Sequence, residues 1–391
     1  MAAAFKKVFK QIKFARMRIV HVLSGLTKGG GERIAVELAN QALANGDVVT
    51  ILAGWHEDPA YLQNTIHPGV DIRFVSRNKS LAYLKICFWI VRNRQWICSQ
   101  DILHGHLTFG TIFGSLTRFI IRFLLHKKTP AFVETNHAVG MPVPAFKRWV
   151  QSRLLLQRDG IILMAKDPFW NNFLVKHPSL KAEIIPNGIA VIRETIGPEQ
   201  KKEWMKKTGI PENAKYIIGS ISMLRADRNP LLYVPLFHEI YKALGNDVHF
   251  VLGGSGEEQG KIEKLVNELG LADHFHLLGL VNEPAKVIAN LDVYVSVSVG
   301  ETAGISMIEA AMCMVPVVGI QLIENYQTKK EDWVWSATDI NAVAGKIIFF
   351  LTHQKESYDY AVGQEAYVKK QFSSATMYKA YRSFYEAVIN A

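Results

Sequence analysis

The sequence is poor in the features that mark several protein classes. Its 391 residues include three cysteines, too few for a disulfide framework and without metal-ligand spacing, so a reducing cytosol is the simplest compartment. Apolar runs of about 18 residues without a charge are missing, which argues against a transmembrane helix. The best candidate, residues 108–125, contains two arginines. At 49% hydrophobic and 20% charged, the chain is not disordered, and its length suits two or three domains.

Acidic residues are scarce in the first half of the chain. Residues 1–190 carry 25 lysines and arginines against 11 acidic residues, a net charge of +14, whereas the remainder carries 20 against 24, a net charge of −4. This asymmetry indicates a polyanionic partner for the first half, either nucleic acid or an anionic membrane. Nucleic acid is the weaker prediction, because the basic residues are scattered and no known binding motif occurs.

The first sixteen residues have no apolar stretch long enough for a signal peptide. Phe5, Val8, Phe9 and Ile12 recur at helical spacing, and basic residues occupy most of the positions between them. The pattern of residues 1–16 predicts a basic amphipathic leader that lies on an anionic bilayer. A solvated, frayed segment explains it equally well.

Strand and helix patterns alternate along both halves of the chain. Strands are predicted over residues 18–23, 48–53, 70–75, 101–104, 131–135 and 160–165, and then over 216–220, 248–253, 274–278, 291–297 and 316–319. The predicted fold class is α/β, with two facing, doubly wound Rossmann-like domains and a ligand-binding cleft between them. The expected segments are the domains 17–188 and 189–370, and a C-terminal helix in 371–391 that packs back on the first domain.

Glycine is concentrated in the loop Gly29-Gly30-Gly31, between a predicted strand and a predicted helix. Free backbone N–H groups and the positive end of the helix dipole favour an anion or a hydroxyl-rich ligand there. The G-x-G-x-x-G pattern of a dinucleotide site is missing, as is its acidic residue. A turn that needs only the backbone freedom of glycine explains the run about equally well.

Two acidic residues mark the second half. Glu301 lies in the loop after an apolar strand, and Glu309 lies about one turn into the next helix, so both can face the carboxyl edge of the sheet. A carboxylate accepts two hydrogen bonds from vicinal hydroxyls, such as those of a sugar or a ribose. Alone, the pair would indicate solvated surface charge.

These stretches form an ordered set with others. GGGER follows the first strand, ETNHAVG contains the isolated His137, and IIPNGI stands at mid-chain; IIGSISMLRADRNP, VLGGSGEE and VGETAGISMIEAAMCMVPVVG follow. From about Met17 to Ile389 the chain resembles the retaining glycosyltransferases of family 4 (glycosyl transferases group 1), which have the two-domain GT-B architecture. The E-x(7)-E pair followed by EAAMCMVPVVG is the most specific element.

The resemblance implies roles for the matching positions. Glu301 would hold hydroxyls of the donor sugar, and Glu309 would hold the ribose of the nucleotide. His137 would contact the donor hexose and support an oxocarbenium-like transition state. The plainer interpretation is a structural histidine whose hydrogen bonds are satisfied within its own loop. His137 and Glu301 are thus the expected catalytic residues. The implied donor-binding residues are Gly29, Gly30, Arg225, Arg228, Gly254, Ala303, Gly304 and Glu309.

The sequence departs from the family at the diphosphate clamp. The family pattern G-R-L-x(3)-K-G corresponds to residues 222–229, where Met223 replaces the arginine and Arg228 replaces the lysine. Arginine is a competent phosphate ligand, since it is bidentate and always charged, but Met223 is not. Arg225 would have to reach the diphosphate instead, or a helix N-terminus would have to hold it. Met314 also stands where the family usually has glycine.

No D-x-D triplet occurs in the chain, which fits a mechanism without a metal. We expect no cofactor: cationic side chains and helix dipoles would stabilise the departing diphosphate in place of Mg²⁺. The resemblance implies transfer of a sugar with retention of anomeric configuration. The donor would be a UDP- or GDP-linked sugar, and the leaving phosphate oxygen would accept the proton of the acceptor.

The basic first domain is the expected acceptor side. Residues 81–98 and 111–128 mix aromatic and aliphatic residues with arginine and lysine, which indicates core helices with charged outer faces or, less strongly, helices that rest on anionic headgroups. With the leader, they predict a bacterial peripheral enzyme on the inner face of the cytoplasmic membrane. Its acceptor would be a lipid-linked glycan in polysaccharide, capsule or lipopolysaccharide synthesis. A nucleotide-sugar epimerase and a non-catalytic partner in a glycan-assembly complex stay open as alternatives.

Overall fold

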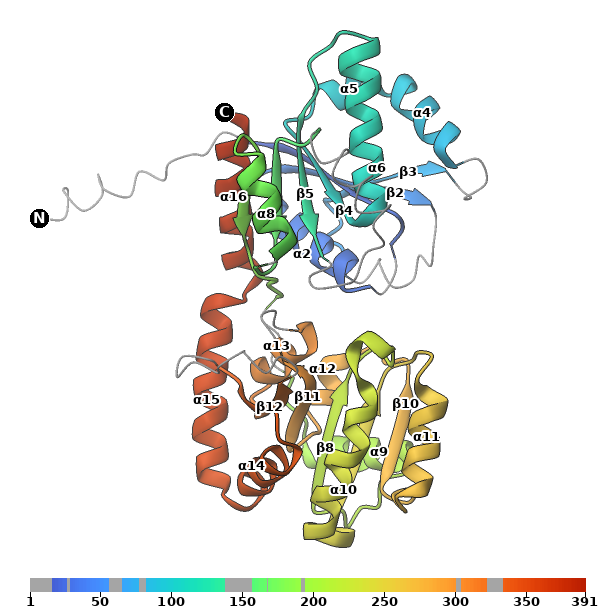
Figure 1. The fold of residues 1–391 in the computed structure, drawn as a ribbon, viewed down its shortest axis with the longest axis vertical. Helices are drawn as coiled ribbons and strands as arrows, with labels where there is room; N and C mark the ends of the chain where they lie inside the picture. The colour runs from blue at the N-terminus through green and yellow to red at the C-terminus, as the bar shows by residue number, and fades with distance from the viewer. Residues whose placement is uncertain are drawn as a thin grey trace, which may run out of the picture. The chain divides into compact units, whose positions relative to one another are not determined.

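The computed structural model describes residues 16–26, 29–55, 65–76, 82–137, 157–166, 168–190, 194–299, 304–321 and 333–391 (Figure 1). Nearly all of the predicted leader, together with Glu301 and Ala303, lies outside the described residues. Contacts divide the chain into two compact units. Unit 1 contains Met1–Leu163, Asp167–Ile184 and Tyr378–Ala391, and unit 2 contains Met164–Lys166 and Ile185–Met377.

Unit 1 is built on a seven-stranded parallel sheet in the order β3-β2-β1-β4-β5-β6-β7. The strand order runs outward in both directions from β1, so the topological switch point lies between β1 and β4. The central strands are buried on both faces, as their runs of valine, isoleucine and leucine predict. The strands are β1 Arg18–Leu23, β2 Val48–Trp55, β3 Asp71–Ser76, β4 Ile102–His106, β5 Ala131–Asn136, β6 Gly160–Leu163 and β7 Lys181–Ile184.

Helices cover the sheet of unit 1. On one face, apolar side chains of α4, α6 and η1 pack with β1, β2, β4 and β5 in a core that includes Ile86, Phe113 and Phe132. Side chains alternate along a strand, so Thr135 faces the other side, where it meets Tyr381 of α16. The helices are α2 Gly30–Ala44, α4 Ala82–Arg92, α5 Arg94–Cys98, α6 Leu107–Arg118 with its π-helical continuation η1 Phe119–Leu124, α8 Pro168–Lys176 and α16 Ser374–Ile389.

Helix α16 is held to unit 1 by a buried polar cluster. The carboxylate of Asp47, which is 1% exposed, accepts hydrogen bonds from Tyr378 and Arg382. The same carboxylate also accepts a bond of 2.8 Å from the backbone N–H of Met17, just before β1. Gly160 lets α16 approach β6 closely, since a Cβ there would lie 2.7 Å from the ring of Phe384.

One helical stretch in the described part of the chain, Leu107–Leu124, is long and apolar enough to cross a membrane. It comprises α6 and η1, and 56% of it is buried within the unit against the sheet. A core helix passes the same test of length and composition, so this stretch gives only weak support for a membrane span.

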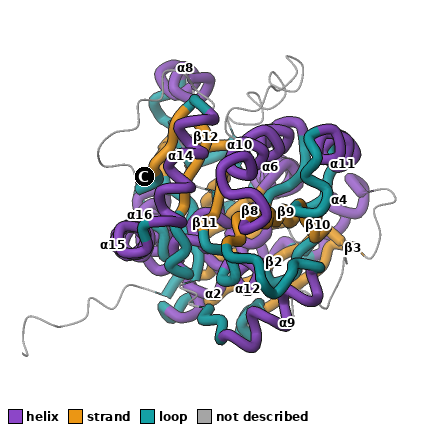
Figure 2. The backbone as a smooth tube through the Cα atoms, turned by 90° about the horizontal axis from the view of Figure 1, so that it is seen from below, coloured by secondary structure: helices purple, strands orange, loops and turns teal. Residues whose placement is uncertain are grey.

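Unit 2 repeats the design with a six-stranded parallel sheet in the order β10-β9-β8-β11-β12-β13. Its strands are β8 Tyr216–Ile221, β9 Val248–Gly253, β10 Phe275–Gly279, β11 Val293–Val299, β12 Val317–Gln321 and β13 Trp335–Ala337. Helices lie on both sides of these strands, α10 and α14 on one and α9 and α12 on the other (Figure 2). The helices are α9 Pro198–Thr208, η2 Ala226–Arg228, η3 Pro230–Leu232, α10 Tyr233–Leu244, η4 Gly245–Asp247, α11 Gln259–Glu268, α12 Pro284–Ile288, α13 Ile305–Met312, α14 Ile340–Thr352 and α15 Gln354–Gln371.

The predicted fold class is confirmed in that both units are Rossmann-like, with parallel sheets flanked by helices. The edge strands β7 and β13 were not predicted, because β7 is polar and largely exposed and β13 has only three residues. Helix α13 ends at Met312. Met314 has a φ of +60°, a left-handed conformation in which the helix cannot continue.

Candidate functional site

The glycine loop of unit 1 lies beside His137. Gly29 is the N-cap of α2 and has extended backbone angles, and Gly30 is the first residue of the helix. A Cβ on Gly31 would lie 3.4 Å from both Cγ and Cδ2 of His137 and 3.2 Å from Leu107. His137 directly follows β5, so the structure brings the predicted glycine loop and the predicted catalytic histidine together at the carboxyl edge of the sheet.

Glu32 is a residue of this edge that the sequence analysis missed. It stands in the first turn of α2, is 8% exposed, and folds back so that its Oε2 would lie 2.1 Å from a Cβ on Gly29. A carboxylate there already complements the positive end of the helix dipole. It favours hydroxyl groups over phosphate as ligands of the glycine loop. The GGGER motif contains Glu32, so its position in the first turn of the predicted helix was the sequence signal that could have identified it.

Behind His137 lies a row of buried histidines. Nε2 of His137 is 3.0 Å from Nδ1 of His106 on β4, and Nε2 of His106 is 3.0 Å from Nδ1 of His21 on β1. His21 and His106 are both 0% exposed. The row therefore runs from the carboxyl edge of β5 across the switch point into the core of unit 1. The sequence signal for this row was the spacing of His104 and His106, which stand two residues apart and so lie on one face of β4. Which side chains of the neighbouring strands they meet depends on the register of β1, β4 and β5.

His104 belongs to a separate branch on the same face of the sheet. Its Nδ1 lies 2.6 Å from the hydroxyl of Tyr385, and its Nε2 lies 2.8 Å from Oγ1 of Thr135. Donor atoms of His21, His104 and His106 all lie within 4.8 Å of one another, close enough to suggest a metal site. Both nitrogens of His104 already have protein partners, and His21 is hydrogen-bonded to His106. The geometry is thus that of a hydrogen-bonded cluster.

Burial keeps these histidines neutral at pH 7. It lowers the pKa of His21 to about 3 and that of His137 to about 4. The pKa values of His104 and His106 are also well below the ordinary range, mainly through burial and further through repulsion by the neighbouring histidines. His137 therefore acts as a neutral hydrogen-bonding group at this edge, not as a cation.

In unit 2, the start of α13 is tied to the carboxyl end of β8. Gly304 is the N-cap of α13, and Oγ of Ser306 donates to the carbonyl oxygen of Ile221 at 2.9 Å. The hydroxyl of Tyr294 lies 2.7 Å from the same Oγ and 3.0 Å from the same carbonyl. Ser306 and Tyr294 were not predicted, and they hold Gly304 and the N-terminus of α13 at the edge where a ligand would bind.

Glu309 lies one turn further along α13 and is 2% exposed. Burial raises the pKa of the Tyr294 phenol, and the charge of Glu309 contributes in the same direction. Glu309 is thus an interior residue near the carboxyl edge, which argues against the interpretation of a solvated surface charge. Its proposed partner Glu301 lies outside the described residues, so the arrangement of the pair stays a prediction.

Gly254 has a structural reason to be glycine. Its φ is +135°, and a Cβ would lie 1.8 Å from the carbonyl oxygen of Ser222. The loop after β9 is bonded to the loop after β8: Ser222 N donates to Gly253 O at 2.9 Å, and Leu224 N donates to Ser255 O at 3.0 Å. This contact fixes the backbone just before Arg225.

The predicted phosphate clamp contains an unpredicted acid. The guanidinium of Arg225 donates two hydrogen bonds to Asp227, from Nε to Oδ1 at 2.8 Å and from Nη2 to Oδ2 at 2.7 Å. The hydrogen bond from Arg225 lowers the pKa of Asp227, which keeps the carboxylate charged. Arg228 lies 3.8 Å from the same carboxylate, and Met223 is 49% exposed. Both candidate cations therefore share one counter-ion.

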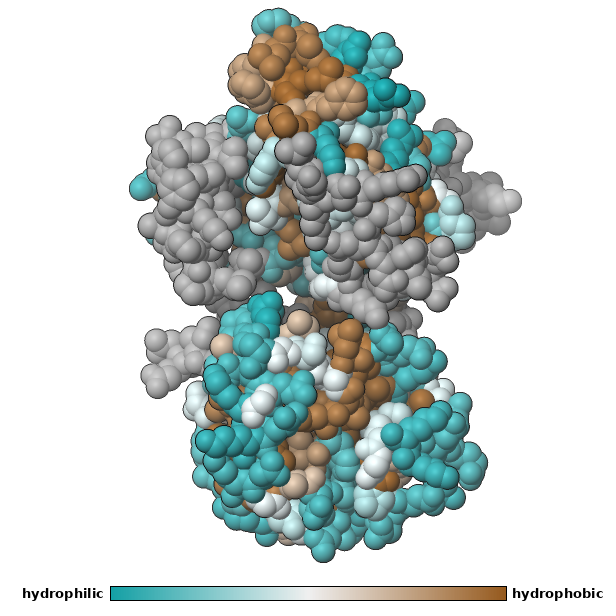
Figure 3. Space-filling view, turned by 90° about the vertical axis from the view of Figure 1, so that its right-hand side faces the viewer, coloured by the Kyte–Doolittle hydropathy of each residue, from teal (hydrophilic) through white to brown (hydrophobic). Residues whose placement is uncertain are grey.

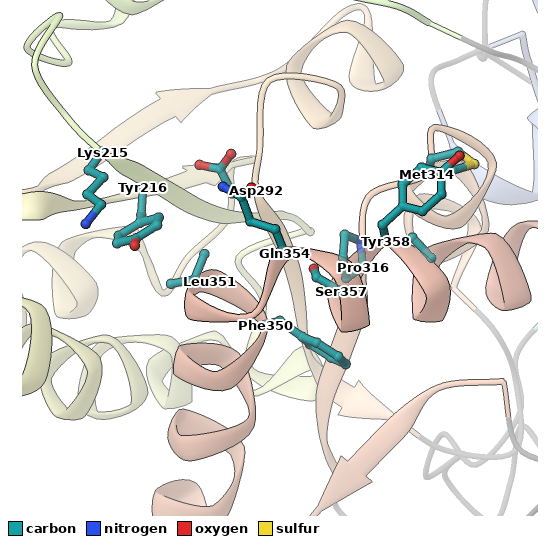
Figure 4. Close-up of a pocket in the computed structure, with 11 residues that line it drawn as sticks. Lys215, Tyr216, Asp292, Met314, Pro316, Phe350, Leu351, Gln354, Ser357 and Tyr358 are labelled. Carbon is teal, nitrogen blue, oxygen red and sulfur yellow. The ribbon is translucent and has the colours of Figure 1, made fainter.

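A cavity of about 270 Å³ lies elsewhere in unit 2 (Figure 4). Its lining includes Lys215, Asp292 and Pro316, which directly precede β8, β11 and β12 respectively. It therefore opens at the amino-terminal edge of the sheet, opposite the edge that carries Arg225 and Gly304. Ligands of open α/β sheets bind at the carboxyl edge, so this cavity is not the predicted site.

With this geometry in place, comparison with known proteins shows what unit 2 is similar to. Residues 200–366 match the family Glycosyl transferases group 1. The group 1 match contains Arg225, Arg228, Gly254, Gly304 and Glu309, and it supports the resemblance inferred from the sequence motifs. It does not include unit 1, where His137 and the glycine loop lie.

Two individual relatives match longer stretches of the chain than the family model does. The chain is 22% identical over 356 residues to the putative glycosyltransferase EpsF of Bacillus subtilis, covering 84% of this chain and 88% of the relative. It is 25% identical over 232 residues to the alpha-monoglucosyldiacylglycerol synthase of Streptococcus pneumoniae, covering 56% and 51%. The chain spans about half the length of the first curated relatives that it matches.

A solved structure of similar fold is that of Anabaena HepE in complex with UDP and glucose. The TM-score is 0.74 at 16% identity, over 94% of this chain and 99% of that one. This likeness shows the fold, which is that of GT-B glycosyltransferases.

Proposed function

We propose that the chain is a retaining glycosyltransferase that moves a sugar from a nucleotide-sugar to a glycan acceptor. The observation that carries the proposal is the burial of Glu309 near the carboxyl edge of unit 2, within the segment that matches group 1. A buried carboxylate that accepts hydroxyl hydrogen bonds is the chemistry that binding of a ribose requires. The HepE complex contains UDP and glucose, which supports a uridine nucleotide as the donor of this chain.

The predicted site residues divide the work of catalysis. Arg228, and Arg225 when it leaves Asp227, would stabilise the negative charge that develops on the diphosphate, as the positive end of α13 would. The neutral imidazole of His137 would hold a hydroxyl of the donor hexose and position its anomeric carbon. Glu301 would grip the remaining sugar hydroxyls. The leaving phosphate oxygen would take the proton of the acceptor on the same face, which retains the configuration, and no metal is required for these steps.

The test of this proposal is release of nucleotide from a panel of UDP-, GDP- and ADP-sugars by the purified chain. We expect turnover of at least one donor, and we expect His137→Ala to lower kcat by about 10²-fold or more, the cost of one lost transition-state contact. The exposed His353→Ala is the matched control. Conversion of a nucleotide-sugar to its epimer without transfer, or turnover unaffected by His137→Ala, would contradict the proposal.

We also propose that unit 1 rests on the anionic inner face of the cytoplasmic membrane and presents a lipid-linked glycan to the site. Helices α4 and η1 contact each other and expose large apolar side chains, the surface that stands out at the top of Figure 3. These side chains are between 42% and 68% exposed, and they are Tyr83, Leu84, Phe88, Val91, Phe119, Phe123 and Leu124. The similarity to the alpha-monoglucosyldiacylglycerol synthase of Streptococcus pneumoniae supports a lipid acceptor.

The charge around these aromatic residues fits an anionic bilayer. Arg92, Arg122, Lys127 and Lys128 are exposed, and Asp101 is the single acidic residue between positions 82 and 128. Basic residues near an anionic surface contribute about 1 kcal/mol each. We expect the chain to sediment with phosphatidylglycerol vesicles, and Phe88→Ser with Phe123→Ser to abolish this. Equal sedimentation with phosphatidylcholine vesicles, or no effect of the two substitutions, would contradict binding of an anionic membrane by α4 and η1.

A further inference from the structure

The row of histidines behind His137 forms one continuous hydrogen-bonded chain. Its two links, His137 Nε2 to His106 Nδ1 and His106 Nε2 to His21 Nδ1, are both 3.0 Å long. The nitrogen that ends the chain in the core, Nε2 of His21, has no hydrogen-bond partner among the described residues. The nitrogen that ends it at the carboxyl edge is Nδ1 of His137.

A neutral imidazole has one N–H donor and one bare nitrogen that accepts. Burial keeps the three rings neutral at pH 7. Each link needs one donor and one acceptor, so the chain has only two consistent arrangements. In one, all three protons are on Nδ1, and each ring donates toward the carboxyl edge. In the other, all three are on Nε2, and each ring donates toward the core.

The buried end of the chain decides between the arrangements. If the protons were on Nε2, His21 would direct an N–H group into a fully buried space with no acceptor among the described residues. Buried N–H groups without an acceptor are rarer in proteins than acceptors without a donor, because the unsatisfied donor is the costlier loss. The arrangement with the protons on Nδ1 leaves only a bare nitrogen in that space.

We propose that His21 and His106 are positioning residues that hold His137 in the Nδ1–H tautomer, so that its Nδ1 donates a hydrogen bond at the carboxyl edge. If the proposed function is correct, the acceptor of that bond is a hydroxyl oxygen of the donor hexose. The tautomer of a histidine is set by the bond that its other nitrogen makes, and here that bond is relayed through two further rings. His104 is outside the chain, because Tyr385 and Thr135 occupy its nitrogens.

The test is a long-range ¹H–¹⁵N correlation spectrum of the full chain, labelled with ¹⁵N-histidine, at pH 7. His137 is assigned from the spectrum of His137→Gln. The expected result is a protonated Nδ1 and a bare Nε2 for His137. A protonated Nε2, or averaged signals from two tautomers, would overturn the proposal. Once His137→Gln has given the assignment, the wild-type spectrum gives this answer even if the chains substituted at His21 do not fold.

Substitutions then test the relay. His21→Phe removes the donor to His106, so we expect His137 to show averaged tautomers and the kcat of donor turnover to fall about tenfold. His21→Gln retains an amide N–H that can donate to His106 and should restore the single tautomer. Tyr385→Phe removes a buried hydroxyl next to His104 only, and it should leave His137 unchanged. An unchanged His137 spectrum in a folded His21→Phe chain would refute the relay.

The two proposals fail in different ways. A protonated Nδ1 of His137 in a chain that turns over no nucleotide-sugar would support the histidine chain and refute the proposed function. Turnover of a nucleotide-sugar with a protonated Nε2 would do the reverse.

Discussion

Asp227 holds the guanidinium of Arg225 through two hydrogen bonds of 2.8 and 2.7 Å. Arg225 is the residue that would have to replace the arginine missing at Met223, so in this structure the replacement cation is already paired. The two side chains are each more than one-third exposed, and the pair is therefore weak enough for a diphosphate to displace.

Removing the Asp227 carboxylate, which competes with the diphosphate for Arg225, should strengthen donor binding. We expect Asp227→Asn to lower the Kd for UDP about threefold to tenfold, because a charge-assisted bond from Arg225 becomes available without first breaking an ion pair. Titration calorimetry on the purified chain measures this. Adding Arg225→Gln should cancel the gain; a gain that persists in the double variant would show that Arg225 is not the ligand.

The buried histidines should make the fold sensitive to acid. Their folded pKa values, about 3 for His21 and about 4 for His137, lie below the ordinary 6.5, so below pH 6.5 the unfolded chain binds more protons than the folded one. Stability is then fully present above pH 6.5 and is lost as the pH falls toward 4, by up to about 1.4 kcal/mol per pH unit for each histidine.

Urea unfolding at pH 7, 6 and 5 measures this dependence. Replacing His21 with Phe should reduce the slope of the free energy of unfolding against pH by the contribution of one histidine. A free energy of unfolding that is constant across this range, or an identical slope in a folded His21→Phe chain, would count against neutral buried rings.

The backbone at two positions predicts opposite effects of substitution. Met314 has a φ of +60° at the end of α13, where Val315 N donates to Ala310 O at 3.0 Å in a typical glycine-ended turn. Met314→Gly should therefore stabilise unit 2 by about 1 kcal/mol. Gly254→Ala should destabilise it by about 3 kcal/mol or more, since its φ is +135° and its Cβ would overlap Ser222.

Thermal unfolding of both variants checks these signs. Gly260→Ala is the control, because Gly260 lies in helix α11, has an ordinary φ and has nothing within 4 Å of a Cβ. It should stabilise by about 0.5–1 kcal/mol through helix propensity. Destabilisation by Met314→Gly would contradict the assigned conformation.

Asp47 should be the most sensitive anchor of helix α16. Asp47→Asn removes the buried carboxylate that Tyr378 and Arg382 share and leaves Arg382 paired with the more exposed Glu386, so we expect a cost of about 3 kcal/mol, the lower end for a broken buried pair. The control is Asp71→Asn, whose pair with Arg73 is exposed and worth less than about 1 kcal/mol. Urea unfolding of the two variants gives the comparison, and equal stabilities would show that α16 is held by apolar packing alone.

The fold could be read from the sequence where local pattern and burial agree. The apolar runs of β1, β2, β8 and β9 predicted those strands because central parallel strands are buried on both faces. The edge strand Lys181–Ile184 has no such pattern, since its residues are largely exposed.

The site could be predicted only in part, for a similar reason. Motifs identified His137 and Glu309, but the link from His137 to His21 depends on the register of β1, β4 and β5, which no local pattern encodes. The ion pair between Arg225 and Asp227 joins residues two apart in the sequence, so the sequence could have revealed it. The folding back of Glu32 over Gly29 depends on a side-chain conformation that residue type alone does not determine.

Binding of UDP to the purified chain tests the central claim most directly. The account predicts that Glu309→Gln, which keeps the shape of the side chain and removes its charge, weakens the Kd for UDP about tenfold to a hundredfold, the loss of a charge-assisted hydrogen bond. Glu268→Gln, a similar change at an exposed position on α11, should leave the Kd unchanged. Equal affinity of the wild-type and Glu309→Gln chains for UDP would contradict the account.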